Sequence, residues 1–296
     1  MKSTKALFYK GKEERMTPEI TIIRGLPNQH FSSIGSIVLL DHIAEKTFLP
    51  KTPKMPDGSF AHPHRGIATL TYILDGGIHH LDSNGGEGKV YSGGLQWMKS
   101  GNGIVHDEFH PYDFQEKGGL FSGFQFWLNL PAKQKAERPE YIAVQSENIN
   151  EFVLADNVGV LRLLLGNYQD KTAIIPAYLA QFMYHIKLNP GKAMELPMNE
   201  NWEYGINAIK GNPKIDNDII LDEKKTAKLY DFSEVMEISN ESNETIEFVL
   251  FGGEPYLEQM VSYGPFIMNT QEGIAKAYSD YNNGHYNEID YSKVQL

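Results

Sequence analysis

The chain contains no cysteine among its 296 residues. Disulfide frameworks, tetrathiolate zinc sites and iron–sulfur clusters are therefore excluded, because each of them requires cysteine thiolates. The absence of cysteine also fits a reducing compartment, so we expect a cytoplasmic protein. The sequence has no continuous apolar run of 18 residues, and none follows Met1, so we predict neither a membrane span nor a secretory leader.

Basic residues are scarce relative to acidic ones. The sequence has 27 Lys and Arg residues against 38 Asp and Glu residues, which gives a formal net charge of −11. Direct nucleic-acid binding depends on Lys and Arg side chains that neutralise phosphates, so we expect no direct nucleic-acid partner. An acidic chain can contact another protein, and a protein partner stays open.

Segments with helical periodicity are few, and strand-like runs separated by Gly, Pro, Asn and Asp fill most of the length. This pattern indicates an all-β protein. One helix is predicted, over residues 271–283, because Thr270 can cap it, Glu272 lies in its first turn, and Ile274 and Ala277 have helical spacing.

The length of the chain exceeds that of most single domains, so two domains are predicted. Residues 131–139 are dense in Lys and Glu, which indicates an exposed crossing between the domains. We therefore place one domain at 1–135 and the other at 136–296. Residues 1 to about 20 are expected to be peripheral.

Two short motifs carry the residues most suited to metal binding. Residues 61–66 read AHPHRG, and residues 103–108 read GIVHDE. Side chains at i and i+2 of a β-strand point to the same side, so His62 and His64 project together, as do His106 and Glu108. If the two strands are adjacent, three imidazoles and one carboxylate meet at one point. This ligand set suits Fe(II), Mn, Cu, Ni or catalytic Zn.

Other histidines are weaker candidates. His30 and His42 have no suitably spaced second ligand, and an isolated histidine in an apolar context is more often a hydrogen-bonded core residue than a ligand. His79 and His80 are consecutive, so at most one of them points inward, and His80 is a candidate for lining the pocket. Asp107 is out of phase with Glu108 and should face away from the metal.

The strands beside the motifs predict which side chains surround the site. Continuing from His64 at even positions gives an apolar face that leaves room beside the metal: Gly66, Ala68, Leu70, Tyr72 and Leu74. Within residues 124–130, Phe124, Phe126 and Leu128 are predicted to pack in the core, with Gln125 and Trp127 on the opposite face.

Several motifs resemble those of the pirin family of the cupin superfamily. They lie at residues 62–66, 69–72, 80–83, 95–98 and 101–106, and again at 250–255 and 264–270. The resemblance implies a bicupin, with two stacked antiparallel β-barrels of jelly-roll type and a C-terminal helix. It further implies one mononuclear metal, usually iron, in the first barrel and none in the second. Family members resemble quercetin dioxygenases, and the eukaryotic namesake is a nuclear cofactor of transcription factors.

This chain departs from the family pattern at two places. Many pirins carry a glutamate where this chain has Ala68, so a carboxylate ligand must come from the second motif, and Glu108 is the well-placed candidate. Residues 92–94 read SGG where pirins often have Pro-Gly-Asp, which alters a turn and leaves the metal ligands unaffected.

Three functional hypotheses follow. The resemblance favours a metal-dependent dioxygenase, most simply with Fe(II), that acts on a flavonol or another enolic aromatic substrate with O2. Glu108 would then be a metal ligand and also accept the proton of the substrate hydroxyl. The alternatives are a metal-bound regulatory protein that acts through a protein partner, and a non-redox cupin enzyme that uses Zn or Mn.

Overall fold

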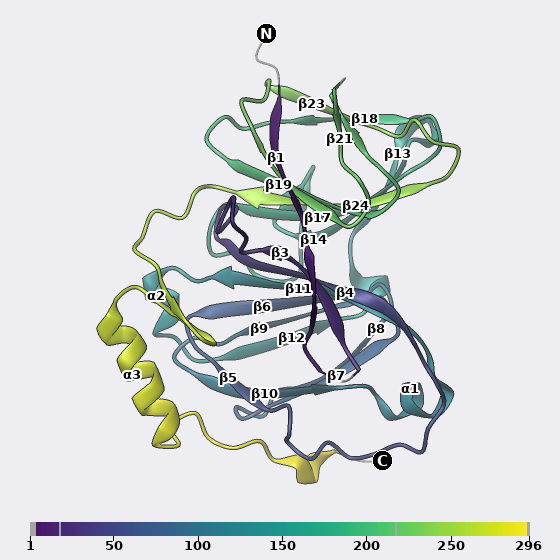
Figure 1. Ribbon diagram of the computed structural model, residues 1–296. Helices are drawn as coiled ribbons and strands as arrows, with labels where there is room; N and C mark the ends of the chain where they lie inside the picture. Colours follow the sequence, from purple (N-terminus) through teal and green to yellow (C-terminus); the bar gives the residue numbers. More distant parts are fainter. Residues whose placement is uncertain (1–3, 18, 217, 295–296) are drawn as a thin grey trace. The chain divides into compact units, whose positions relative to one another are not determined.

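The computed structural model describes residues 4–17, 19–216 and 218–294 and contains two compact units. The histidine unit comprises residues 43–148 and 257–296, and the companion unit comprises residues 1–42 and 149–256. The division falls inside strand β4 (Ile37–Phe48). Each unit therefore consists of two separate stretches of the chain (Figure 1).

The histidine unit is built mainly from two antiparallel sheets. One sheet has the strand order β5-β10-β7-β8, and strands β12, β9, β6 and β11 lie side by side in that order in the other. The bounds are β5 (His62–His64), β6 (Ile67–Asp75), β7 (Gly77–Asp82), β8 (Glu87–Tyr91), β9 (Leu95–Lys99), β10 (Ile104–Phe109), β11 (Gly119–Asn129) and β12 (Glu140–Val144). A hairpin of β25 (Val261–Tyr263) and β26 (Phe266–Met268) is added from the end of the chain.

The companion unit repeats this plan with a seven-stranded sheet, β1-β22-β19-β24-β17-β14-β13, and a four-stranded sheet, β18-β23-β20-β21. A continuous apolar core contains buried side chains from both sheets. The bounds are β1 (Lys5–Lys10), β2 (Lys12–Arg15), β3 (Thr21–Leu26), β13 (Glu151–Leu154), β14 (Gly159–Leu165), β15 (Asn167–Tyr168), β16 (Lys171–Thr172), β17 (Gln181–Leu188), β18 (Ala193–Pro197), β19 (Glu203–Lys210), β20 (Lys214–Ile215), β21 (Ile219–Ile220), β22 (Lys225–Tyr230), β23 (Val235–Ser239) and β24 (Ile246–Gly253).

The two units have the same strand pairing. In the histidine unit the pairs are β5·β10, β10·β7, β7·β8, β6·β9, β6·β11 and β9·β12. In the companion unit the corresponding pairs are β18·β23, β23·β20, β20·β21, β19·β22, β19·β24 and β22·β1. This correspondence confirms the predicted all-β bicupin, in which one cupin plan occurs twice.

The strand β1 is one reason why the companion unit consists of two stretches of the chain. It pairs with β22 from Lys5↔Tyr230 to Lys10↔Lys225, and so takes the place in the companion unit that β12 holds in the histidine unit. β1 is an edge strand with mostly exposed side chains, which fits the prediction that residues 1 to about 20 are peripheral, although the strand is paired in a sheet.

The segment predicted as an exposed crossing belongs to the histidine unit. Residues 131–139 contain the short helix α2 (Ala132–Lys135), and the Lys135 side chain is buried. Its Nζ donates hydrogen bonds to Asn129 Oδ1 at 2.7 Å and to the Ile267 carbonyl oxygen at 2.7 Å. These two acceptors satisfy the amino group of a lysine that lies inside the unit. The contact units thus differ from the contiguous division at residue 135.

The predicted C-terminal helix is confirmed as α3 (Gln271–Asn282). Ile274 and Ala277 are buried on one side of it and pack with Phe266 of β26, and Val105 of β10 lies against the same cluster. The helix therefore packs on the β25–β26 hairpin, next to the strand that carries the second histidine motif. The remaining helices are short: α1 (Tyr112–Lys117) and three 3-10 turns, η1 (Ser146–Asn148), η2 (Ala155–Asn157) and η3 (Tyr291–Lys293). Within the described residues, none of the helices has the length and apolarity needed to cross a lipid bilayer.

Thr270 caps α3, and we expect its removal to weaken the helix. Its Oγ1 accepts a hydrogen bond from the backbone N–H of Gly273 at 3.0 Å. A Thr270→Ala variant should lose about 1 kcal/mol of unfolding free energy, because an N-terminal N–H of the helix is left without this acceptor. Urea denaturation measures this change. A Thr270→Ser variant keeps the acceptor oxygen and should stay near the wild type, whereas equal stability of the alanine variant would contradict the capping role.

Candidate metal centre

Three of the four predicted ligands form a compact group. The backbone pairing of β5 with β10 places His62 directly opposite His106, with His64 two residues along the same strand. The ring centroids lie 4.4 Å apart for His62 and His106, 4.9 Å for His62 and His64, and 5.1 Å for His64 and His106. One ring nitrogen from each histidine lies within 4.8 Å of the other two. The alternation of side chains in two adjacent strands therefore produces the expected convergence.

Backbone carbonyl groups orient two of these rings. His62 Nδ1 lies 2.8 Å from the Phe60 oxygen, and His64 Nδ1 lies 3.1 Å from the Pro265 oxygen. A carbonyl oxygen only accepts, so each Nδ1 carries the hydrogen and each Nε2 presents a lone pair. Carbonyl groups behind ligating histidines fix ring orientation in the same way in known metal sites.

The electrostatics keep the buried imidazoles neutral. Burial lowers the pKa of His64 to about 3, and the neighbouring His62 adds to the effect. Burial also lowers the pKa of His106 well below its usual value, with further contributions from His62 and His64. Neutral imidazole is the form that binds a metal, so no proton has to be displaced from these rings at neutral pH.

The group fits a metal ion. His64 Nε2 is buried and has no hydrogen-bond partner in the part of the chain that the structure describes. The Nε2 atoms of His62 and His106 lie 3.0 Å apart. Two nitrogens bound at right angles to one metal at about 2.1 Å would lie about 3.0 Å from each other. A divalent cation would thus satisfy a buried lone pair that the protein leaves unpaired.

Glu108 lies beside this group and belongs to a second, overlapping one. Its carboxylate is within 4.8 Å of ring nitrogens of His80 and His106, so His106 is common to both groups. Gln96 Nε2 donates a hydrogen bond to Glu108 Oε1. Burial raises the pKa of Glu108 to about 7, the Gln96 hydrogen bond opposes that shift, and Asp107 adds to it. Asp107 itself faces away, as predicted, and accepts a hydrogen bond from the Tyr291 hydroxyl at 2.9 Å.

The predicted apolar face of β6 is wrong. The chain leaves the sheet of β5 at Gly66 and enters the other sheet at Ile67, so side-chain alternation does not continue through this point. Gly66 has φ +82°, and a Cβ there would lie 1.9 Å from the Ile267 oxygen. Beyond it the odd positions face the site: Thr71 lies 3.4 Å from Gln96 Nε2, and Thr69 pairs with Trp127.

The side chains beside the histidines are consequently polar and aromatic. The Trp127 ring meets the His64 ring edge-on at 5.0 Å. The even positions pack on the opposite face of the sheet, where Ala68 is paired with Leu128 and Leu70 with Phe126. The predicted separation of Phe124, Phe126 and Leu128 from Gln125 and Trp127 is confirmed, since the first three are buried and the last two are partly exposed.

The other histidines lie outside the three-histidine group. His79 Nε2 is 3.1 Å from Glu87, on the opposite side of β7 from His80. His80 points inward, as predicted for a pocket residue, with Nδ1 3.5 Å from His106 Nδ1. His30 and His42 belong to neither of the possible metal-binding groups among the described residues.

In the companion unit, apolar side chains replace the histidines. The strands β18 and β23 correspond to β5 and β10, and their inward positions hold Met194 and Leu196 opposite Ile238 and Met236. All four are buried in the core of the unit. The positions that correspond to the β5 and β10 histidines therefore carry hydrophobic side chains in this unit.

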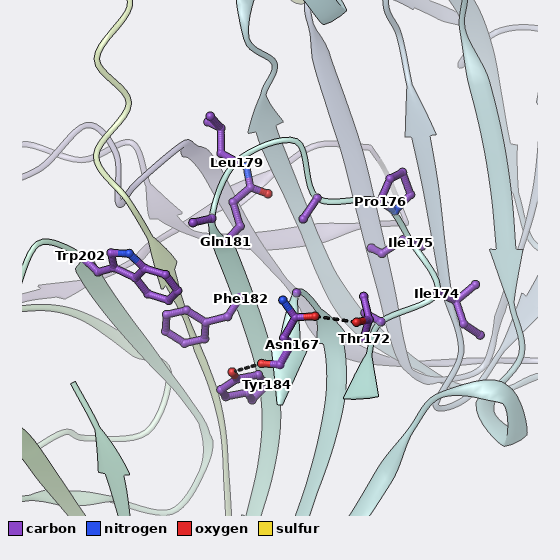
Figure 2. Close-up of a pocket in the computed structure, with 14 residues that line it drawn as sticks. Asn167, Thr172, Ile174, Ile175, Pro176, Leu179, Gln181, Phe182, Tyr184 and Trp202 are labelled. Atoms are coloured by element: carbon purple, nitrogen blue, oxygen red, sulfur yellow. Dashed lines mark hydrogen bonds between the residues drawn. The ribbon is translucent and has the colours of Figure 1, made fainter. Parts of the chain in front are cut away.

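The companion unit contains a pocket of about 370 Å³, which Figure 2 shows. Phe182, Tyr184 and Trp202 lie along one side of it, and Asn167 accepts hydrogen bonds from Thr172 and Tyr184. None of the residues that line it is a histidine, cysteine, aspartate or glutamate. The lining therefore offers no metal-binding set, and both candidate metal-binding groups among the described residues lie in the histidine unit.

Sequence reasoning missed the residues that support the site. Gln96 and Tyr141 are two of them, and Asp82 is a third because its Oδ2 lies 3.2 Å from His80 Nε2. Tyr141 lies beyond the predicted boundary at residue 135, and Gln96 had no charge or metal-ligating group to single it out. The available signals were the motifs at 80–83 and 95–98, which contain Asp82 and Gln96, and Gly86 and Gly88, which leave room for neighbouring side chains.

Comparisons with known proteins agree with this architecture. The sequence model of the pirin family matches residues 19–128, and the model of the pirin C-terminal cupin domain matches residues 183–287. Human pirin is 34% identical over 232 residues, which cover 77% of each chain. A Pseudomonas aeruginosa protein, provisionally named quercetin 2,3-dioxygenase, is 30% identical over 253 residues, which cover 86% of this chain and 87% of the relative. A crystal structure of quercetin 2,3-dioxygenase from Acinetobacter baumannii superposes with a TM-score of 0.89 at 29% identity, covering 97% of this chain and 99% of that one. The chain belongs to the pirin family.

Proposed function

We propose that the protein is a metal-dependent dioxygenase of the quercetin 2,3-dioxygenase type, which cleaves a ring of a flavonol or another enolic aromatic with O2. The observation that carries this proposal is the convergence of three imidazoles, one with an unpaired buried nitrogen, next to the Glu108 carboxylate. The relatives from Pseudomonas and Acinetobacter, whose names refer to this activity, support it.

In this proposal His62, His64, His106 and Glu108 hold one divalent metal. Fe(II) is the first choice, and Cu, Mn, Ni and Zn suit the same set of nitrogen and oxygen donors. When bound, an iron or copper ion would supply the Lewis acidity and the redox chemistry that a reaction with O2 needs. The Glu108 carboxylate lies within 4.8 Å of ring nitrogens of His80 and His106. A rotation of its side chain toward His62 and His64 would complete the set of four ligands.

The protein's own residues would provide proton transfer and orientation. The 3-hydroxyl of a flavonol has to lose its proton, and the Glu108 carboxylate is the nearby acceptor. Gln96 donates to one oxygen of Glu108, which leaves the other oxygen able to accept that proton. Trp127, edge-on to His64, gives the site an aromatic wall against which a flat substrate can pack.

Oxygen consumption tests the proposal. Protein reconstituted with Fe(II) or Cu(II) should consume O2 in the presence of quercetin, at about 1 s⁻¹ or faster, with parallel loss of the flavonol absorbance. A His62→Ala variant treated in the same way should show only the background rate of quercetin oxidation. If the isolated protein carries a redox-inert metal and reconstituted protein consumes no O2 with quercetin, the proposal fails and non-redox cupin chemistry is favoured.

A further inference from the structure

Tyr141, on β12, contacts two different residues behind the proposed ligands. Its ring lies parallel to the His80 ring, with the centroids 4.1 Å apart and an angle of 2° between the planes. Its hydroxyl donates a hydrogen bond to Gln96 Oε1 at 3.0 Å. Burial raises the pKa of Tyr141, so the phenol keeps its proton and remains a donor at neutral pH.

The first contact leads to Glu108. A carboxylate only accepts, so Glu108 faces the Gln96 nitrogen, and the Tyr141 hydroxyl donates to the Gln96 oxygen at the other end of the amide. The same nitrogen is 3.4 Å from Thr71 Oγ1. The Gln96 side chain is 2% exposed, so water does not readily replace these partners. The Tyr141 hydroxyl therefore holds the far end of the Gln96 amide while the near end donates to the carboxylate.

The second contact leads to His106. Asp82 accepts from His80 Nε2 at 3.2 Å, which leaves His80 Nδ1 as an acceptor. His106 Nδ1, 3.5 Å away, can then donate to it, and His106 Nε2 presents its lone pair toward His62. Backbone carbonyl groups accept hydrogen bonds from His62 and His64. The partner of His106 is instead the His80 side chain, on which the Tyr141 ring stacks. The orientation of His106 is thus sensitive to the position of the tyrosine ring.

Two glycines make room for this arrangement. A Cβ at Gly88, directly opposite His80 on β8, would lie 2.8 Å from Tyr141 Cε1 and 2.8 Å from its hydroxyl oxygen. A Cβ at Gly86 would lie 2.2 Å from Asp82 Oδ2 and 3.0 Å from Tyr141 Cβ. The backbone at neither glycine requires the left-handed region, so the space itself is what the small residue provides.

We propose that Tyr141 is a positioning residue for the metal centre, which fixes His106 through His80 and Glu108 through Gln96. This inference rests on the proposed metal site of the dioxygenase. In this proposal Tyr141 orients both β10 ligands, His106 and Glu108. The β5 ligands, His62 and His64, are oriented by main-chain oxygens instead. Partners of this kind behind metal ligands typically change metal affinity by about 10–100-fold when removed.

Binding of Co(II) to the metal-free protein tests the proposal without relying on turnover. The dissociation constant is measured by competition with a chelator, and the visible spectrum of bound Co(II) reports the ligand geometry. Tyr141→Phe keeps the ring on His80 and loses the hydroxyl, so we expect about tenfold weaker binding and an altered spectrum. Tyr141→Leu loses both contacts and should weaken binding by about 100-fold. Gly88→Ala displaces the ring and should approach the leucine variant.

Tyr91→Phe is the matched control, because its hydroxyl donates to Asp113 rather than to Gln96. It should bind Co(II) like the wild type. Wild-type affinity and spectrum in Tyr141→Phe would overturn the proposal, and this variant removes a single oxygen, so it answers the question even if Tyr141→Leu does not fold. If the wild type itself binds no Co(II), the metal site and the proposed function fail together. If the wild type binds Co(II) and consumes O2 with quercetin while the variants bind equally well, the positioning role alone is wrong.

Discussion

A His64→Ala variant is expected to lose the stabilisation that a metal gives to the wild type. His64 contributes the buried Nε2 atom that has no protein partner among the described residues, and its other nitrogen is held by the Pro265 carbonyl. A metal present at 100 times its dissociation constant stabilises the folded state by about 2.7 kcal/mol. For a chain of this size that corresponds to a rise in melting temperature of about 5 °C. We expect this rise with Co(II) in the wild type and its absence in the variant.

Thermal unfolding with and without Co(II) measures the effect, and metal content after dialysis confirms it. The matched control is His79→Ala, which also removes a buried histidine of the same unit, but one that faces Glu87. The control variant can melt at a lower temperature, yet its rise with Co(II) should equal that of the wild type. A His64→Ala protein that binds Co(II) as tightly as the wild type would show that the three histidines are not a metal site.

The part of the site that depends on strand alternation could be predicted from the sequence. His62 and His64 lie two residues apart in one strand, and the same holds for His106 and Glu108, so a single assumption of adjacent strands brought them together. The same rule correctly predicted that Asp107 and Glu108 face opposite sides of their strand, and that His79 and His80 do so as well. Alternation is a local property of the backbone, and it needs no knowledge of the tertiary fold.

The prediction failed where the chain passes from one sheet to the other. At Gly66 the alternation is interrupted, and the even positions that were expected beside the metal face away from it. Nothing in residues 62–74 marks this change except the glycine itself. Tyr141 could not be found for a related reason: its contacts with His80 and Gln96 join residues 45 or more positions apart, and no local pattern encodes such pairing.

The sequence predicted that the fold is duplicated, but it did not predict which segments of the chain form each unit. Strand-like runs in both halves indicated two similar barrels, and the pairing of the strands agrees. The companion unit includes β1, and the histidine unit includes α3, because of contacts between residues more than 150 positions apart. Lys5 pairs with Tyr230, and Val105 packs against the cluster that contains the α3 residues. Hydrophobic periodicity identifies a strand or helix, and it does not identify its neighbour.

A Glu108→Gln variant is expected to keep its fold and lose most of its activity. Glutamine has nearly the same shape and can still meet Gln96, so packing around β10 should be preserved. The amide carries no charge and is a very weak base, so it cannot accept the proton of a flavonol hydroxyl. General base catalysis contributes about 10²–10⁴-fold, and we expect quercetin-dependent O2 uptake to fall by about that factor.

The variant also loses one negatively charged donor, so its activity has to be measured with saturating metal. Under those conditions the variant should hold metal through His62, His64 and His106 but turn over slowly. This result would separate the proton-accepting role of Glu108 from its role as a ligand. Asp107→Asn is the matched control, because this neighbouring carboxylate faces Tyr291 and should leave turnover unchanged. Full metal content together with full turnover in Glu108→Gln would contradict both roles, because the carboxylate is the one group that the substitution removes.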